Sequence, residues 1–337
     1  MQAQSPQPAG PVLRILMSAQ SAKRHAARVQ AALPDVPHRI VTIESAGPDL
    51  DADVAFISRD VTGLSTKHEV LSATQAYYDA MCGCRSLKWV HTHSAGADRP
   101  IFGVLRGKGV LVTTSAGANA SVVTQSALAG ILALARHFPL MGRAQREHRW
   151  APLIGSGLPV DIAGQTATVV GWGAIGQYIG QLLGCLGMKV VAVRQSVKPS
   201  PPALETISFD MLPQVLPRTD WLILACPLTP VTQGLLNAQA LALLPPGAFL
   251  VNVARGEVVD EPALCDALAD ARLAGAYLDV FAHEPLAPDS PLWDMPNVIV
   301  TPHSAGFSDG NGERVVRMFL DNLARWASGQ PLANISA

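Results

Sequence analysis

Short apolar runs alternate with stretches of helical periodicity along most of the chain. In the N-terminal third each apolar, β-branched run predicts a strand, and apolar positions three and four apart predict helices at 21–33 and 64–82. The predicted strands are 12–17, 38–43, 54–58, 88–92 and 110–113. Such alternation is typical of an α/β fold in which helices cover both faces of a parallel sheet.

The pattern restarts after an alanine-rich helix predicted at 121–138. At about 1.5 Å per residue this helix is long enough to run from one domain to the next, and 337 residues exceed the usual size of a single core. An amphipathic helix at 313–328 is expected to pack back on the first domain. We therefore predict one domain from 12–115 plus 307–337 and another from 116–306. The strands predicted in the second domain are 166–170, 189–193, 221–225, 248–252, 275–279 and 298–301.

Three glycines follow the first strand of the second domain with the spacing of a dinucleotide-binding turn, Gly171, Gly173 and Gly176. The first allows a tight turn, the second lets the backbone approach a pyrophosphate, and the third lets the next helix pack closely. That helix begins near Ala174 and Ile175, where unpaired amides and a partial positive charge favour a pyrophosphate. We predict a dinucleotide site here; a purely structural glycine turn is the alternative.

Composition excludes several function classes. Lys and Arg total 25 against 26 acidic residues, and a net charge of -1 provides no basic footprint for nucleic acid or for an anionic membrane. No apolar stretch approaches the roughly 20 residues that span a bilayer. The five cysteines are scattered without a C-x-x-C pair, so we predict no metal site. Residues 1–11 lack the features of a signal peptide and predict a disordered tail, and we expect a cytoplasmic protein.

Three side chains that can take part in catalysis follow late strands of the second domain: Arg255, Glu284 and His303. Ligands of open α/β sheets bind at strand carboxyl ends, so we expect the three to converge on the nicotinamide end of a dinucleotide. Hydride transfer to a 2-oxo acid needs a cation for the substrate carboxylate, a proton donor of near-neutral pKa and a carboxylate that orients the donor. Arg255, His303 and Glu284 fit these roles in that order, although each alone has an ordinary structural explanation.

Four blocks, taken in order, resemble the signature of the D-isomer-specific 2-hydroxyacid dehydrogenases. They are G-x-G-x-x-G at 171–176, N-V-A-R-G at 252–256, L-D-V-F with H-E-P at 278–285, and T-P-H-S-A-G at 301–306. The resemblance implies two Rossmann-like domains with doubly wound parallel sheets, the cofactor domain being inserted into a flavodoxin-like substrate domain. It also implies that Arg255, Glu284 and His303 are the catalytic set, that Arg255 and His303 touch the substrate, and usually a homodimer.

Further matches to this family assign binding residues. The loop 94–97 resembles the one whose backbone amides receive the substrate carboxylate; a glycine turn without a ligand is the alternative. Asp279 resembles the acidic residue that contacts the nicotinamide carboxamide. Trp150 resembles a tryptophan that in some relatives reaches the neighbouring subunit's site, and an interface or core Trp is equally compatible with the sequence. The matched substrate residues are Ser94, Ala95, Gly96 and Ala97, and the matched cofactor residues include Pro227, Thr232 and Ala254.

The end of the second strand of this domain bears on the choice of cofactor. NAD-selective members carry Asp or Glu there, whereas this chain continues with Arg194, Ser196 and Lys198. These side chains can form charge-assisted hydrogen bonds to a 2'-phosphate. We therefore predict NADP as the preferred cofactor, with NAD possible if Arg194 instead stacks on the adenine.

The substrate is predicted only by elimination. Glu284 disfavours the formate dehydrogenase branch, which carries Gln there, and the sequence after His303 is too short for the regulatory domain of many phosphoglycerate dehydrogenases. A compact acid of the glyoxylate or hydroxypyruvate type fits best, and a larger D-2-hydroxy acid is the alternative. His91, His93 and Arg59 lie near the predicted cleft, where they would suit a more polar substrate; surface histidines are the simpler explanation.

Two rival classes share parts of this pattern. A cofactor-sensing corepressor or scaffold on the same fold would retain the dinucleotide site, although the chain lacks long partner-binding tails. Another Rossmann enzyme, such as an adenosylhomocysteinase-like or alanine dehydrogenase-like protein, should lack the ordered blocks around Arg255, Glu284 and His303.

Overall fold

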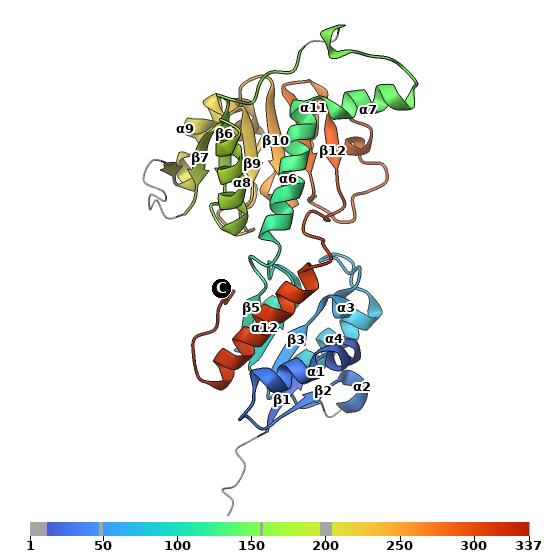
Figure 1. Cartoon of the computed structure of the whole chain (residues 1–337), viewed down its shortest axis with the longest axis vertical. Helices are drawn as coiled ribbons and strands as arrows, with labels where there is room; N and C mark the ends of the chain where they lie inside the picture. Colours follow the sequence, from blue (N-terminus) through green and yellow to red (C-terminus); the bar gives the residue numbers. More distant parts are fainter. Residues whose placement is uncertain (1–11, 47–49, 156–157, 196–203, 337) are drawn as a thin grey trace, which may run out of the picture. The chain divides into compact units, whose positions relative to one another are not determined.

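The computed structural model describes residues 12–46, 50–155, 158–195 and 204–336, and the chain divides into two compact units (Figure 1). Unit 1 combines the chain up to Ala118 with the chain from Asp309 onward, and unit 2 is Asn119–Ser308. The tail predicted at 1–11 lies outside the described residues. In the part of the chain that is described, no helix has the length and apolar character needed to cross a membrane.

Unit 1 is built on a parallel sheet of five described strands in the order β2-β1-β3-β4-β5. This order is the one found in flavodoxin-like doubly wound sheets. Its strands are β1 (Leu13–Leu16), β2 (His38–Val41), β3 (Val54–Ile57), β4 (Trp89–Thr92) and β5 (Leu111–Thr114). Its helices are α1 (Ala19–Ala32), α2 (Ile43–Ala46), α3 (Arg59–Thr62), α4 (Ser72–Gly83), α5 (Pro100–Gly107) and α12 (Asn311–Ala327).

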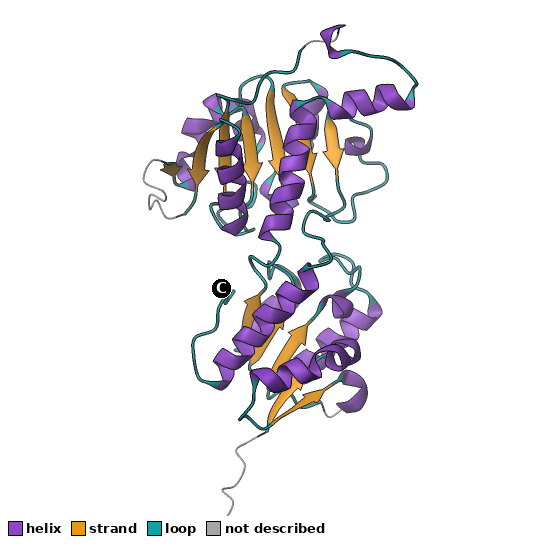
Figure 2. Ribbon diagram, in the orientation of Figure 1, coloured by secondary structure: helices purple, strands orange, loops and turns teal. Residues whose placement is uncertain are grey.

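Alternating side chains of these strands are buried on both faces of the sheet. Figure 2 shows the strands of this sheet in orange and its helices in purple. On one face Phe56 and Trp89 pack with Phe319 of α12. On the other face Ile57 and Val90 pack with residues of α4 and α5. The final helix of the chain thus completes the core of unit 1.

Unit 2 is built on a parallel sheet of seven described strands in the order β12-β11-β10-β9-β6-β7-β8. Counted from β6, the first six have the order of a doubly wound dinucleotide-binding sheet, and β12 extends it. The strands are β6 (Thr166–Val170), β7 (Lys189–Val193), β8 (Glu205–Ile207), β9 (Trp221–Leu224), β10 (Ala248–Asn252), β11 (Leu273–Leu278) and β12 (Val298–Val300). The helices are α6 (Ala120–Ala135), α7 (Phe138–Arg146), α8 (Ala174–Cys185), α9 (Leu212–Val215), α10 (Ala238–Leu243) and α11 (Glu261–Ala269). Helices α6 and α8 cover one face, and α9, α10 and α11 cover the other.

The fold class predicted from sequence is confirmed, and its deviations lie at element ends. The strand predicted at 38–43 ends at Val41 because the Thr42 and Ser45 hydroxyls accept each other's backbone amides and start α2. The helix predicted at 64–82 begins only at Ser72, since a side-chain bond from Leu71 N to Ser65 Oγ replaces the helical pattern before it.

The helix predicted at 121–138 corresponds to α6, and α7 after it was not predicted. α6 ends at Ala135, and His137 follows with a φ of 57°, a left-handed conformation that cannot continue an α-helix. Phe138 and the proline after it then open α7. Strand β8 was not predicted, because three residues are too short to show a period.

Candidate active site

The glycine turn between β6 and α8 has the geometry of a dinucleotide site. Gly171 has a φ of 101°, and a Cβ there would lie 2.5 Å from the backbone of Cys226. A Cβ on Gly176 would lie 1.9 Å from the carbonyl oxygen of Gly171, so the helix packs directly on the turn. In contrast, a Cβ on Gly173 would meet no described atom within 4 Å. The space above Gly173, at the N-terminus of α8, is where a pyrophosphate fits, next to the amides of Ala174 and its successors.

Two segments flank this turn. The Gly171 amide donates to Val193 O at 2.8 Å, which places Arg194 directly beside the turn. On the other side the chain leaves β9 towards Pro227, where Thr232 Oγ1 donates to Pro227 O at 2.6 Å and fixes the loop. The predicted cofactor residues on both segments therefore border the glycine turn. Ser196 and Lys198 lie outside the described residues.

His303 and Glu284 form a hydrogen-bonded pair. His303 Nδ1 lies 2.8 Å from Glu284 Oε2, and the side chains are 49% and 14% exposed. The other carboxylate oxygen accepts the amide of Phe281 at 3.2 Å, so Glu284 is held in place by its own turn. A carboxylate that accepts from Nδ1 stabilises the protonated ring and leaves Nε2 to hold the mobile proton. The pair can therefore deliver or accept a proton at an accessible group.

Arg255 is carried by a turn that packs against the same region. The Asn252 side chain accepts the amide of Ala254 at 3.0 Å and donates to Arg255 O at 3.1 Å, which closes the turn after β10. A Cβ on Gly256 would lie 1.8 Å from the carbonyl carbon of Phe281, so only glycine permits this approach. The Arg255 turn and the turn that carries Glu284 are thereby in backbone contact. The Arg255 Nη1 group itself donates to Ala254 O at 2.7 Å. Unit 2 thus carries all three residues predicted as catalytic, and their common role stays a prediction.

Asp279 holds the loop that carries His303. Its Oδ1 accepts hydrogen bonds from Thr301 Oγ1 at 2.6 Å, Ser304 N at 2.9 Å and Ala305 N at 3.0 Å. Its backbone oxygen accepts the amide of His303 at 2.8 Å. Burial raises the pKa of Asp279, and the bond from Thr301 opposes that rise. His303 has a φ of 50°, rare for a non-glycine residue, and these bonds stabilise it.

Sequence reasoning did not identify the side chains that support this loop. Tyr277 OH lies 3.1 Å from Thr301 Oγ1, and because Thr301 donates to Asp279, its oxygen accepts from Tyr277. Glu261 Oε2 accepts the amide of Ala282 and so fixes the start of the H-E-P turn. Thr301 lies within a recognised block, which could have signalled its role. Tyr277 and Glu261 become visible only when the strands and helices are placed.

The loop 94–97 of unit 1 presents free backbone donors. Ser94 Oγ donates to Gly96 O at 2.8 Å, and Ser115 N donates to Ser94 O at 2.9 Å, so the loop is fixed after β4. Among the described residues, the amides of Ala95, Gly96 and Ala97 meet no acceptor. Successive amides of this kind bind anions, and a substrate carboxylate is such an anion.

His91 and His93, which lie near this loop in the sequence, are more buried than typical surface histidines, and burial lowers the pKa of each. His91 is 0% exposed and bonds to Thr113 Oγ1 at 2.8 Å and Ser115 Oγ at 3.1 Å, and burial lowers its pKa to about 3. His91 is therefore a neutral core residue. His93 is partly buried, and burial together with nearby cations lowers its pKa to about 3.

Trp150 is 96% exposed within this chain, which excludes the core explanation for it.

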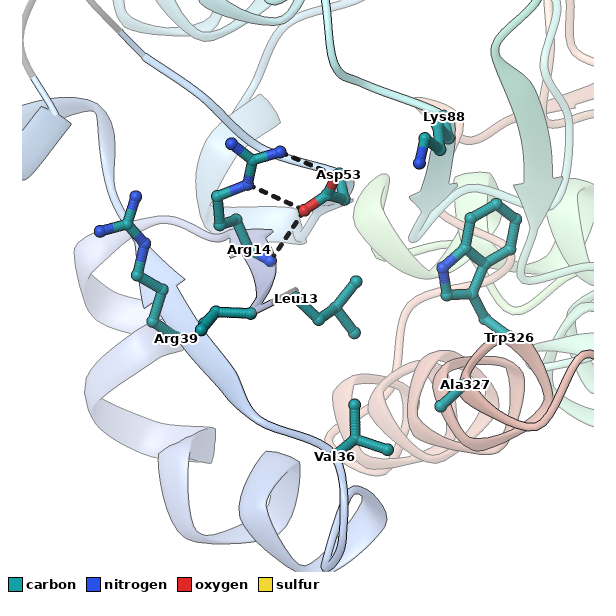
Figure 3. Close-up of a pocket in the computed structure, with 9 residues that line it drawn as sticks. Leu13, Arg14, Val36, Arg39, Asp53, Lys88, Trp326 and Ala327 are labelled. Carbon is teal, nitrogen blue, oxygen red and sulfur yellow. Dashed lines mark hydrogen bonds and ion pairs between the residues drawn. The ribbon is translucent and has the colours of Figure 1, made fainter. Parts of the chain in front are cut away.

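One cleft among the described residues lies away from this site. It has a volume of about 660 Å³ in unit 1, where Figure 3 shows Arg14 bonded to Asp53, with Leu13 and Trp326 nearby. Leu13 is the first residue of β1, and Asp53 precedes β3, so the cleft lies at the amino ends of the strands. Ligands of such sheets bind at carboxyl ends. We therefore place the candidate site on the carboxyl ends.

Comparisons with known proteins identify the family. Residues 128–305 match the family model described as D-isomer specific 2-hydroxyacid dehydrogenase, NAD binding domain. A (S)-sulfolactate dehydrogenase of Chromohalobacter salexigens is 31% identical over 297 residues, which cover 84% of this chain and 94% of the relative. A D-3-phosphoglycerate dehydrogenase of Mycobacterium tuberculosis is 37% identical over 257 residues, covering 76% of this chain and 47% of the relative. The chain thus spans about half the length of such relatives.

Among solved structures, a D-isomer specific 2-hydroxyacid dehydrogenase from Xanthobacter autotrophicus Py2, in complex with NADPH and MES, is similar throughout. It is 30% identical, with a TM-score of 0.76, and the match covers 97% of this chain and 98% of that one.

Proposed function

The chain belongs to the D-isomer-specific 2-hydroxyacid dehydrogenase family, and we propose that it reduces a 2-oxo acid to a D-2-hydroxy acid with a reduced nicotinamide cofactor. The observation that carries the proposal is the 2.8 Å hydrogen bond between His303 Nδ1 and Glu284 Oε2. This pair is a proton donor with its orienting carboxylate, and its turn is in backbone contact with the one that carries Arg255.

The residues around the glycine turn fit a dinucleotide. The pyrophosphate would lie over Gly173 at the N-terminus of α8, and Arg194 would bind the 2'-phosphate of NADP, the cofactor that we propose as preferred. When bound, the reduced nicotinamide supplies the hydride. Pro227, Thr232, Ala254 and Asp279 are proposed to line the rest of the cofactor.

The protein's own groups have separate tasks in this proposal. The Arg255 guanidinium binds the substrate carboxylate and polarises the carbonyl. The amides of the loop 94–97 are proposed from the family resemblance as further substrate contacts. His303 Nε2 gives its proton to the carbonyl oxygen as the carbonyl carbon is reduced, and Glu284 stabilises the imidazolium before that transfer. In the opposite direction neutral His303 accepts the hydroxyl proton.

A spectrophotometric screen of 2-oxo acids with NADPH and NADH tests this function. We expect turnover with NADPH, and a loss of about 100-fold or more in kcat for His303→Gln. His38→Gln, at the start of β2, is the matched control and should keep wild-type kcat. Absence of turnover by the wild type with both cofactors, despite dinucleotide binding, would favour a cofactor sensor and reject the enzyme.

The compact acids glyoxylate and hydroxypyruvate are the substrates that we propose from sequence. Two relatives are named for larger acids, phosphoglycerate and sulfolactate, which carry a second acidic group. Both classes belong in the screen.

We also propose that the protein is a homodimer that uses an arm formed by α7 and the described residues between α7 and position 160. In Figure 1 this arm extends away from the sheet of unit 2. Large exposed apolar side chains are unusual on a monomer when they gather in one segment, and a second copy would cover them. They are Phe138, Leu140, Trp150, Ile154, Leu158 and Val160.

A further inference from the structure

The cleft of about 660 Å³ in unit 1 has no task in the proposed function (Figure 3). It lies at the amino ends of the strands, whereas the loop 94–97 follows the carboxyl end of β4. A cleft of this volume is large enough for a small molecule, and small-molecule sites are mostly apolar with a few well-placed polar groups. The lining of this cleft has that character.

Four charged side chains of the lining form one row across neighbouring strands. Arg39 of β2 pairs in register with Arg14 of β1. The Asp53 amide donates to Arg14 O, and the Lys88 amide donates to Asp53 O, both at 2.9 Å, so the row continues to the start of β4. Neighbouring strands lie about 4.8 Å apart, which places the backbones of Arg39 and Lys88 about 14 Å apart. A cation therefore stands at each end of the row.

Arg14 and Asp53 hold each other at the middle of the row. Arg14 Nε donates to Asp53 Oδ2 and Nη2 donates to Oδ1, both at 2.9 Å. These bonds lower the pKa of Asp53 against the effect of burial, and the charge of Lys88 lowers it further. Arg14 also pairs with Asp51 through Nη1. This group carries one excess negative charge, which the cations at the two ends of the row outnumber.

The charged groups at the two ends can bind a ligand. Arg39 and Lys88 are exposed residues that line the cleft. Within the described part of the chain, the Arg39 guanidinium and the Lys88 ammonium take part in no hydrogen bond or ion pair. Each can therefore donate charge-assisted hydrogen bonds to an acid group in the cleft.

The remaining lining is apolar. Leu13, Val36 and Trp326 pack against the core between the sheet and α12 and also border the cleft. The Trp326 ring stacks on Trp89 with ring centroids 5.7 Å apart, which holds the indole in place. Ala327 ends α12, and a helix C-terminus carries a partial negative charge. This side of the cleft therefore favours an apolar, planar group over an acid.

We propose that the cleft binds a small organic dianion with a planar apolar middle, whose two acid groups pair with Arg39 and Lys88. Figure 3 shows Leu13 between these two cations, with Trp326 on the same side as Lys88. The middle of the ligand would lie over Leu13 and against the indole. All lining residues belong to unit 1, so the site is separate from Arg255, Glu284 and His303 and holds whether or not the proposed reaction is correct.

Isophthalate is the probe, because it joins two carboxylates through a flat ring. We expect calorimetric titration of the full chain, saturated with NADPH, to give a Kd of about 1 mM or below. Benzoate lacks one acid and should bind about 10-fold more weakly. Glutarate separates its two acids by the same number of carbons without the ring and should bind about 5-fold more weakly. Equal affinities for isophthalate and benzoate would overturn the proposal.

The double variant Arg39→Gln with Lys88→Gln should weaken isophthalate binding by about 10-fold or more and remove its advantage over benzoate. Both side chains are exposed, so the fold should be kept. The matched control is Arg24→Gln with Lys23→Gln, which changes the net charge equally on the exposed face of α1, outside the cleft. An equal loss in this control would show that only net charge attracts the probe, and would refute the site.

Two more variants separate this cleft from the proposed active site and test its apolar side. Arg255→Gln should leave isophthalate binding unchanged; loss of binding there would assign the probe to the active site and reject the cleft. Trp326→Leu should weaken isophthalate by about 5-fold and glutarate by less than about 2-fold, because only the ring uses the indole. Equal losses for both ligands would contradict the placement of the ring against Trp326.

Discussion

At the scale of single residues, the proposed chemistry depends on the difference in exposure between His303 and Glu284. The imidazole is half exposed, as a group that meets a substrate must be, whereas the carboxylate is largely buried and receives a backbone amide. A buried carboxylate interacts more strongly with a cation than an exposed one does, because less water screens it. Glu284 is thus suited to act on the substrate through His303.

We therefore expect Glu284→Gln to lower kcat by about 100-fold and to leave the dissociation constant of NADPH unchanged. The amide keeps the shape of the side chain but cannot stabilise the imidazolium. Steady-state kinetics and fluorescence titration of NADPH measure the two quantities. Glu205→Gln, an exposed residue of β8, is the control. A variant that bound NADPH more weakly and kept its kcat would contradict this role.

The buried His91 should make the free energy of unfolding depend on pH. Burial lowers its folded-state pKa to about 3, whereas in the unfolded chain the pKa returns to about 6.5. Between these values the unfolded state binds one more proton, so this contribution to stability is complete above about pH 6.5 and declines as pH falls, by about 1.4 kcal/mol per pH unit. Denaturant unfolding of His91→Gln should show a correspondingly shallower decline between about pH 6 and pH 4. Equal slopes in variant and wild type would show that His91 is protonated in the fold.

At the scale of elements, the junction of β7 with the glycine turn sets the cofactor preference that we propose. Arg194 donates its backbone amide to Ile207 O of β8, so a new side chain leaves the edge of the sheet intact. We expect Arg194→Asp to lower the ratio of kcat/KM with NADPH to that with NADH by about 100-fold, because a carboxylate repels the 2'-phosphate and accepts from ribose hydroxyls. Lys189→Gln, at the exposed start of β7, should leave the ratio unchanged. An unaltered ratio in Arg194→Asp would remove the basis for NADP preference.

The loop after β12 gives a second prediction at this scale. The Thr301 hydroxyl accepts a hydrogen bond from Tyr277 on β11 and donates one to the Asp279 carboxylate. That carboxylate accepts backbone amides of the loop around His303. Thr301→Val keeps the shape but breaks both hydrogen bonds of the hydroxyl. We expect kcat to fall by about 10-fold with only a small loss of unfolding free energy, about 1–2 kcal/mol. Thr301→Ser keeps the hydroxyl and should restore most of the activity; failure of Ser to do so would assign the effect to packing.

The same elements show how far the sequence could predict the site. The glycine turn and the four blocks located Arg255, Glu284 and His303, because strand ends and turn residues are local features of a sequence. The support of His303 by Tyr277 could not be predicted, since the bond joins two strands through a register that only the folded sheet defines. For the same reason the burial of His91 was missed. His91 lies near the end of its strand, and the sequence does not show whether a side chain there is still covered by the helices on the sheet faces.

At the scale of the whole molecule, the alternation of strands and helices was enough to predict two doubly wound sheets, but element ends followed local hydrogen bonds. His137 illustrates this point, because its left-handed backbone separates α6 from α7, a helix that the sequence did not predict. Nothing in the periodicity marks that residue. The division matters, since α7 then leads into the arm that we propose as a dimer contact.

That arm provides the last prediction. Trp150 and Ile154 are among the most exposed apolar side chains described, and burying such side chains gives about 1.5–3 kcal/mol each. We expect a dimer by light scattering coupled to size exclusion, and Trp150→Ser with Ile154→Ser should shift it towards monomer at micromolar concentrations. Leu64→Ser is the control, because Leu64 is equally exposed but lies in unit 1, outside the arm. If the double variant remained dimeric, the contact would lie elsewhere; if it became monomeric and kept its kcat, each protomer would contain a complete site, and Trp150 would have no catalytic role in a neighbouring subunit.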